Sequence, residues 1–242
     1  MGVFFGSTMK NLDRIVNKIE KHISEKDRVR EQALRSSRDI IISCRKAIQL
    51  LHQNQLKKAA VAITKASAQL TQLYTIAEGY PDIGHAGFVE NAAQEVVEAQ
   101  CLLHIMQGKA LPDPDELQTT YSAYLLGLCD VVGELRRSAL DFILKGEASK
   151  AYTNLKLMEK IYDAMIRFDY PSALVPIRKK QDMIRGLIEK TRGELAVASC
   201  EKRIDHKTDE FRGILDQMSE GKQKGKKAKK KKSYDLDLDE VW

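Results

Sequence analysis

Proline and glycine are distributed so that most of the chain is free to form long helices. The five prolines stand at positions 81, 112, 114, 171 and 176, and the first stretch, from about residue 8 to residue 52, contains neither proline nor glycine. Proline breaks helix interiors and glycine weakens them. Apolar residues recur every three or four positions in that stretch, at Ile15, Ile19, Ile23 and again from Leu34. This spacing predicts one long helix, or two helices in line.

The same pattern continues through the rest of the chain, and no alternation typical of strands competes with it. We expect further helices over residues 56–77, 84–107, 115–144, 148–168 and 171–218. The segment from Tyr121 to Val132 is apolar almost all round, so its helix should be central. The sequence therefore predicts an all-α single-domain bundle of six to seven antiparallel helices, spanning residues 9–219.

Both ends of the chain differ from this domain. Residues 1–8 are expected to be a flexible leader, with Met9 as a candidate natural start. Residues 220–242 are expected to be a disordered tail, because eight lysines within eleven positions repel one another and bury nothing. The chain carries a net charge of +6, but residues 221–242 hold eight lysines and four acids, so most of the excess belongs to the tail. A basic total does not by itself make the domain a nucleic-acid binder.

Other features exclude several classes of protein. No apolar run approaches the roughly 18 residues that a membrane-spanning helix needs. The four cysteines lie far apart without a C-x-x-C pair, which indicates reduced, buried thiols and a cytoplasmic protein. Cys101 and His104 share a helix face, but no second pair completes a soft-metal site, so core packing is favoured. There is no phosphate-binding glycine loop or nucleophile motif.

Two pairs of acids are the candidate catalytic and metal-binding residues. Glu95 and Glu98 are three residues apart, and Asp130 and Glu134 are four apart, so each pair lies on one face of its helix. Two neighbouring helices can then bring four hard oxygen donors together, which suits Mg²⁺ or Mn²⁺. Spacing alone also fits solvated helix faces. Asp130 favours a site, because an ionised aspartate in an apolar segment is costly unless a cation meets it.

Arg137, three residues after Glu134, is a candidate for that cation. Basic residues near the acids are candidate contacts for RNA phosphates, although each also fits an ordinary ion-paired surface. The predicted RNA-binding set is Arg38, Arg45, Lys46, Arg136 and Arg137, and the run Arg178-Lys179-Lys180 is a further candidate phosphate contact.

Three stretches of the chain resemble the translin family, and within it the translin-associated factor X (Trax) group. They are Ser37-Arg38-Asp39-Ile40 with the following Cys44-Arg45-Lys46 and Ile48-Gln49-Leu50-Leu51-His52; Gln94-Glu95-Val96-Val97-Glu98-Ala99; and Tyr124-Leu125-Leu126-Gly127 with Asp130-Val131-Val132-Gly133-Glu134-Leu135. The resemblance covers about residues 28–195. Val96 replaces an aromatic residue of the family segment. No long insertion separates the third and fourth helices, which makes the chain similar to a compact archaeal catalytic subunit.

The resemblance implies a seven-helix fold, a closed homo-oligomer such as an octamer, and Mg²⁺-dependent cleavage of single-stranded RNA. It also implies that Glu95, Glu98, Asp130 and Glu134 are the catalytic acids and metal ligands. DNA as a second ligand and a separate translin-type partner subunit stay open, as does a nuclear location directed by the lysine-rich tail. Two alternatives also stay open: a protein that binds single-stranded RNA or DNA without cutting it, and a helical scaffold whose acidic C-terminus docks a partner protein.

Overall fold

The protein is a bundle of helices in which two helices are much longer than the others. A computed structural model describes Met9 and residues 11–234, with side chains as far as Leu215. The helices in this part of the chain are α2 (Leu12–His52), α3 (Leu56–Ala77), the single turn α4 (Pro81–Gly84), α5 (Gly87–Met106), α6 (Tyr121–Leu144), α7 (Ala148–Met165) and α8 (Arg178–Tyr234). Among these residues there is no strand, which confirms the predicted all-α class.

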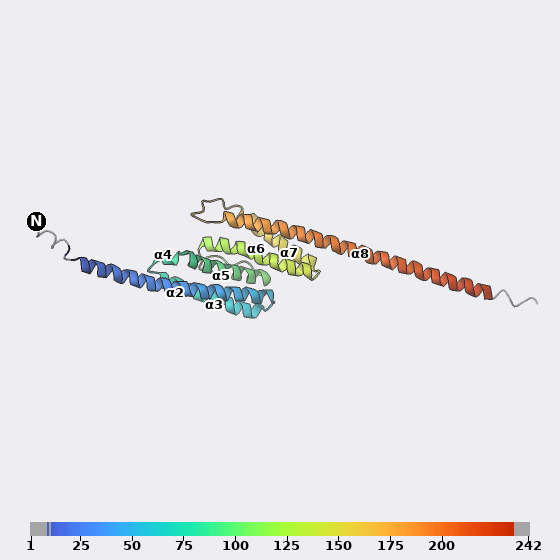
Figure 1. Cartoon of the computed structure of the whole chain (residues 1–242), viewed down its shortest axis with the longest axis horizontal. Helices are drawn as coiled ribbons and strands as arrows, with labels where there is room; N and C mark the ends of the chain where they lie inside the picture. Colours follow the sequence, from blue (N-terminus) through green and yellow to red (C-terminus); the bar gives the residue numbers. More distant parts are fainter. Residues whose placement is uncertain (1–8, 10, 235–242) are drawn as a thin grey trace, which may run out of the picture.

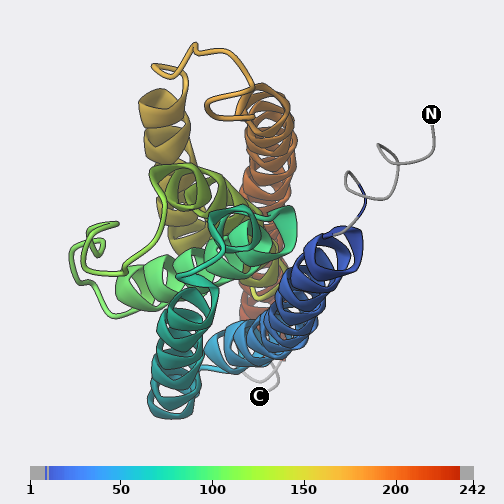
Figure 2. The same cartoon turned by 90° about the vertical axis from the view of Figure 1, so that its left-hand side faces the viewer.

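The helices form three layers along one long axis. α2 and α3 pair on one side, α5 and α6 lie in the middle, and α7 and α8 pair on the other side, as Figures 1 and 2 show. α5 packs against α2, α3 and α6, while α6 packs against α5, α7 and α8. Small and branched side chains such as Ala92, Val96 and Val131 are fully buried between these layers. α5 and α6 are therefore the central helices, as the apolar segment of α6 predicted.

Gly127 allows the two central helices to approach each other closely. A Cβ atom at this position would lie 2.6 Å from the carbonyl oxygen of Gln94 and 2.8 Å from Cβ of Val97. Both distances are far below normal van der Waals contact, so only glycine fits here. Gln94 and Val97 flank Glu95 on α5, and Gly127 precedes Asp130 on α6. The close approach thus places the two acidic segments side by side.

Several helix boundaries differ from the predicted ones. α8 begins at Arg178 and not near residue 171, because Pro176 has no N–H to donate and restricts the residue before it. α6 begins at Tyr121 and not at residue 115. Thr120 caps the start of this helix, because its side chain accepts a hydrogen bond from the Ala123 amide at 3.1 Å. The helix expected over 84–107 begins later, as α5 at Gly87, because Ala86 is extended, and the single turn α4 ends just before it at Gly84.

The end of α8 differs from the prediction. α8 continues to Tyr234, so the backbone of residues 220–234 is helical where the sequence suggested disorder. Lysine, glutamine and alanine all have good helix propensity, which explains the difference. The predicted leader, residues 1–8, and the acidic end, residues 235–242, lie outside the described residues. In the described part of the chain no helix is long and apolar enough to cross a membrane.

The cysteines agree with the expectation of free thiols except in one position. Cys44, Cys101 and Cys129 are buried and unbonded, whereas Cys200 is exposed. Cys200 was expected in the core, but it lies on the part of α8 that extends past the bundle. Burial first, and then the nearby charges of Glu95 and Glu98, raise the pKa of Cys44 to about 12.

Candidate acidic cleft

The acids predicted from the sequence lie around the contact of α2, α5 and α6. A cleft of about 280 Å³ is lined by Arg45, Ile48 and Gln49 from α2, Glu95 and Glu98 from α5, and Glu134 and Arg137 from α6. Asp130 is not among the lining residues. The structure therefore brings three of the four predicted acids to one cleft, and it places two of the predicted RNA-binding arginines at the same cleft.

Glu98 is the one of the four acids whose ionised form is clearly disfavoured by its surroundings. Its pKa is raised from 4.5 to about 8, first by burial and then by the charges of Asp130, Glu95 and Glu134, while Lys180 opposes the increase. A raised pKa means that the negative form is disfavoured. Glu98 has no hydrogen bond or ion pair with another side chain in the described part of the chain. The charges of the other three acids, Asp130 included, therefore all act on Glu98.

The other three acids are each held by a basic side chain from a different place in the fold. Arg45 Nη2 on α2 lies 3.1 Å from Oε1 of Glu95. His52 Nε2, at the end of α2, contacts Oε2 of Glu134, and the His52 side chain is only 10% exposed. Lys180 Nζ, from the first turn of α8, contacts Oδ1 of Asp130.

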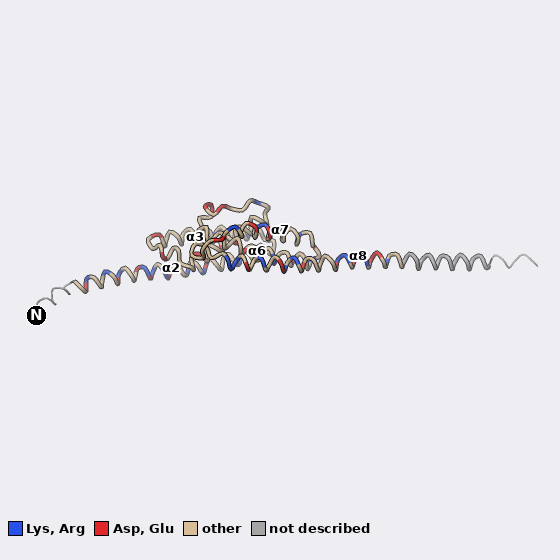
Figure 3. Tube along the Cα trace, turned by 90° about the horizontal axis from the view of Figure 1, so that it is seen from above, with Lys and Arg blue, Asp and Glu red and all other residues tan. Residues whose placement is uncertain are grey.

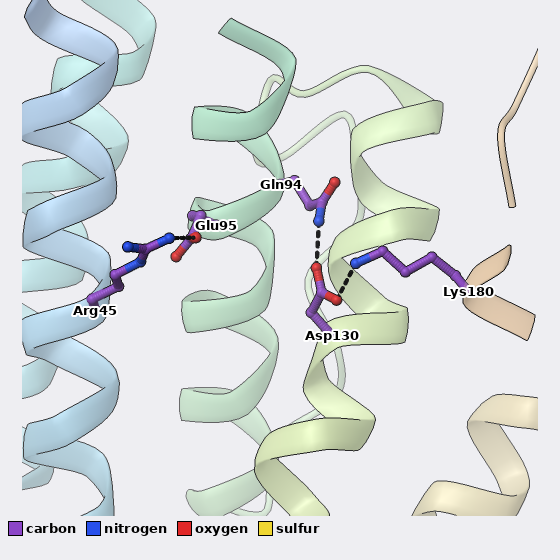
Figure 4. Close-up of polar contacts among 5 residues, drawn as sticks. All are labelled: Arg45, Gln94, Glu95, Asp130 and Lys180. Carbon is purple, nitrogen blue, oxygen red and sulfur yellow. Dashed lines mark hydrogen bonds and ion pairs between the residues drawn. The ribbon is translucent and has the colours of Figure 1, made fainter. Parts of the chain in front are cut away.

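Asp130 is fully engaged by these contacts. Lys180 donates to Oδ1, and the amide of Gln94 donates to Oδ2, as Figure 4 shows. The sequence correctly indicated that a donor or cation must meet this aspartate, but Arg137 was the wrong candidate. Arg137 Nη1 instead lies 3.9 Å from Oε2 of Glu134, three residues earlier on α6. Figure 4 also shows Arg45 reaching Glu95 from α2.

The remaining predicted RNA-binding residues differ in what they contact. Arg136 is only 16% exposed and points to α8, where it donates to both carboxylate oxygens of Glu194 at 2.8 Å and to Thr191 at 2.7 Å. Its contacts tie α6 to α8 and do not face the cleft. Arg38 and Lys46 are exposed on α2 outside the cleft lining, and neither belongs to an ion pair among the side chains that the structure describes.

Three residues of the site were missed by sequence reasoning. His52, Gln94 and Lys180 hold the acids, yet the histidines form no recognisable motif and Lys180 was considered only as a phosphate contact. His52 and Gln94 do lie inside the stretches that carry the family resemblance, which was the available signal. Of the residues described, no three His, Cys, Asp or Glu side chains stand close enough together to hold a metal ion. In place of that arrangement, each acid except Glu98 is bound to a side-chain donor.

The donor chemistry nevertheless fits a divalent cation. Four carboxylates supply the hard oxygen ligands that Mg²⁺ and Mn²⁺ prefer. Burial first and the charges of three neighbouring acids second raise the pKa of Glu98, and a bound cation would stabilise its ionised form. At the alternative pair, Cys101 is buried and His104 Nδ1 donates to the Ala110 carbonyl oxygen at 2.6 Å, a bond that leaves Nε2 free, so core packing of this pair stays a prediction.

The fold and this cleft define an all-helical protein with an acidic centre between its first and its two central long helices. The model of the Translin family matches residues 28–192, which include all four acids and all residues of the cleft lining. The chain therefore belongs to the Translin family. A relative, the uncharacterized protein MJ0175 of Methanocaldococcus jannaschii, is 31% identical over 194 residues, which are 79% of this chain and 84% of the relative.

Solved structures support the same assignment. The crystal structure of AfC3PO is 33% identical, with a TM-score of 0.71, and covers 77% of this chain and 97% of its own. A structure of AfC3PO in complex with duplex RNA matches with 31% identity and a TM-score of 0.67 over the same shares. Apo-NeC3PO, at 17% identity and a TM-score of 0.69, covers 76% of this chain and 96% of its own, and it shows the likeness of the fold alone.

Proposed function

We propose that this Translin-family protein is a Mg²⁺-dependent endoribonuclease of the Trax type that cleaves single-stranded RNA. The observation that carries the proposal is the gathering of Glu95, Glu98 and Glu134 at one cleft, where burial and the charges of three other acids raise the pKa of Glu98 to about 8. An isolated surface acid has no such cost. Acids are gathered in this way mainly where a cation or a proton transfer uses them.

Glu95, Glu98, Asp130 and Glu134 are the residues that would hold Mg²⁺, with Mn²⁺ as a substitute. When bound, the cation would neutralise the negative charge that develops on the phosphodiester. One carboxylate would accept the proton of the attacking water, so that hydrolysis yields a phosphate and a hydroxyl end. Arg45 and Arg137 line the same cleft and are the best placed to bind the phosphate of the substrate.

RNA as the ligand is supported by the relative AfC3PO, of which a complex with duplex RNA has been solved. The duplex in that complex makes strand preference a point to test directly. We also propose a closed homo-oligomer, with an octamer as the expected size, and a cytoplasmic location. Three buried free thiols support a reducing compartment. A translin-type partner subunit, DNA as a ligand and a nuclear location are the alternatives to be tested.

The experiment measures cleavage of labelled single-stranded RNA, duplex RNA and single-stranded DNA in Mg²⁺ or EDTA. Glu98→Gln and Asp130→Asn should abolish Mg²⁺-dependent cleavage while the oligomeric mass stays unchanged. Glu189→Gln, which removes an exposed acid of α8 that does not line the cleft, is the matched control and should cut normally. Undiminished cleavage by a purified double variant of Glu98 and Asp130 would disprove the proposal.

A second candidate function is RNA binding without cleavage. The observation that favours it is the engagement of three acids by Arg45, His52 and Lys180, which satisfies their charge without a metal. In this case RNA is retained equally in Mg²⁺ and EDTA and is never shortened. The same variants then leave RNA affinity nearly unchanged, because the acids serve only to hold the helices together.

A further inference from the structure

Both long helices extend beyond the bundle, in opposite directions along its long axis. Figures 1 and 3 show the first part of α2 leaving one end and the last part of α8 leaving the other. No side chain is buried in residues 12–28 of α2, here called the α2 extension, or in residues 196–215 of α8, here called the α8 extension. Apart from Arg28, both lie outside residues 28–192, which match the family.

The α2 extension carries an apolar stripe with one acidic flank. Leu12, Val16, Ile19 and Ile23 follow one another at spacings of four, three and four, and each is 45–59% exposed. This is the spacing of a helix that packs along another helix. Three acids seven residues apart, Asp13, Glu20 and Asp27, form a line directly beside the stripe, and Lys18 and His22 lie on its other side.

The α8 extension has a matching stripe. Val197, Ile204 and Phe211 recur every seven residues on one face, and Phe211 is 63% exposed. Glu201 and Asp205 lie on the same side of this stripe as the three acids do on the α2 extension, and Arg203 and Lys207 lie on the other side. Lys207 also pairs with Glu210 at 3.0 Å, a solvent-exposed contact of little stability.

We propose that the α8 extension of one copy packs against the α2 extension of a second copy, side by side and parallel. Both helices run in the same direction along the molecule, so a shift of one copy along the long axis brings the two extensions together in parallel (Figure 1). Seen from one end of a parallel pair, the residues clockwise of the stripe on one helix face the residues anticlockwise of the stripe on the other. Glu20 then faces Arg203 and Lys207, while Lys18 and His22 face Glu201 and Asp205.

Charge also disfavours the other arrangements of the same stripes. In an antiparallel pair the matching flanks meet, which places the acidic line of the α2 extension against Glu201 and Asp205. An unsupported helix of this length is only marginally stable in water, so each extension gains from a partner. Because the two extensions point away from each other, that partner comes from outside the chain. The contact joins unlike surfaces, so it makes a ring or a chain of copies.

Two substitutions that place a charge on a stripe test the contact in the full-length protein. The mass of the assembly is measured by sedimentation at several protein concentrations. Ile19→Glu removes the α2 stripe and Phe211→Glu removes the α8 stripe. Each should weaken the association of copies at least about tenfold, because each places a charge in an apolar contact. A mixture of the two variants should form pairs that are larger than either variant alone but smaller than the wild-type assembly. In such a pair the α8 extension of the Ile19→Glu copy still fits the α2 extension of the Phe211→Glu copy, and no second contact can form.

The controls are Lys21→Glu and Asp209→Lys, which change charge on the opposite face of each extension and should leave the mass as in the wild type. Circular dichroism should show the same helix content in all variants, since the changed side chains are exposed. The proposal is overturned if only one of the two stripe variants loses association, if neither does, or if the mixture stays small. Contacts between bundles in the proposed closed oligomer are common to all these proteins, so they do not affect the comparison.

Discussion

At the scale of the residue, Glu98 sets the character of the site. Its carboxyl group is mostly buried, faces three other acids and has no side-chain donor among the residues described. Its neighbours Glu95 and Glu134 are paired with Arg45 and His52. The metal-free protein therefore concentrates the electrostatic cost of the cleft on one group, and that group should control how stability depends on pH.

We predict that the metal-free protein loses stability as pH rises, and that Glu98→Gln removes this loss. The pKa of Glu98 is raised from 4.5 to about 8 in the folded protein, so the folded state keeps a proton that the unfolded state has released. Stability is therefore highest below pH 4.5 as far as this group is concerned, and it falls between pH 4.5 and 8. The loss should be about 2–5 kcal/mol.

Urea unfolding in EDTA at several pH values measures this effect. Glu189→Gln, at an exposed acid of α8 outside the cleft, is the control and should keep the wild-type slope. An equal slope in wild type and Glu98→Gln would show that Glu98 ionises as easily as an exposed acid. Added Mg²⁺ should restore stability at high pH in the wild type but not in the variant.

Lys180 gives a second prediction at this scale. Its ammonium group contacts Oδ1 of Asp130, one of the carboxylates that would hold a divalent cation under the proposed function. Lys180→Met should therefore tighten Mn²⁺ binding several-fold while it lowers the stability of the metal-free protein by about 1–3 kcal/mol. Titration calorimetry measures the metal affinity. Lys179→Met, one residue away and exposed, should change neither quantity, and weaker metal binding by Lys180→Met would contradict the prediction.

At the scale of the element, the close contact of α5 and α6 is the feature that builds the cleft. Gly127 lies against Gln94 and Val97, so the backbones of the two helices meet where their acids lie. The interhelical tie from Arg136 to Glu194 then holds α8 against α6, and this position of α8 brings Lys180 to Asp130. The geometry of the site thus depends on helix spacing more than on any loop.

We predict that Gly127→Ala destabilises the protein by about 1–3 kcal/mol, because the added methyl group forces α5 and α6 apart. Gly133→Ala is the matched control on the same helix. A Cβ atom there would meet nothing within 4 Å, so this change should stabilise by about 0.5–1 kcal/mol through helix propensity. Chemical denaturation measures both. Equal effects of the two substitutions would show that the helices are not in tight contact at Gly127.

At the scale of the whole molecule, most of the excess positive charge lies apart from the candidate catalytic acids. The total is +6, yet eight lysines lie within residues 221–242 and the acidic cleft lies in the middle of the bundle. Lysine side chains bind the phosphates of any nucleic acid through their positive charge, and this binding weakens as the salt concentration rises. The tail should therefore contribute to RNA affinity without contributing to the choice of substrate or to cleavage.

Deletion of residues 221–242 should weaken RNA binding at low salt and make the dependence of affinity on salt less steep. The rate of Mg²⁺-dependent cleavage at saturating RNA should stay within about twofold of the wild type, a difference of only ~0.4 kcal/mol. Filter binding over a salt series and single-turnover cleavage check the two parts. A loss of cleavage at saturating RNA would assign the tail a role in the reaction itself.

Local pattern alone was sufficient to predict the helices and the faces on which their acids lie. Periodic apolar residues and missing prolines indicated all six long helices, and the spacings of Glu95 with Glu98 and of Asp130 with Glu134 placed each pair on one face. The boundaries were less accurate where a second proline or a cap intervened, as at Pro176 and Thr120. These errors arise because short-range turn chemistry competes with periodicity at helix ends.

Only the tertiary structure decided which side chain meets which acid. Lys180 is 50 residues from Asp130 and His52 is 82 residues from Glu134, and no local spacing links such pairs. It also showed that Arg136 holds α8 while Arg137 faces the cleft, although the two are adjacent in sequence. Helix formation depends on neighbours three and four residues away, so the sequence by itself determined it. The partners of a charge depend on how whole helices pack, and only folding brings them together.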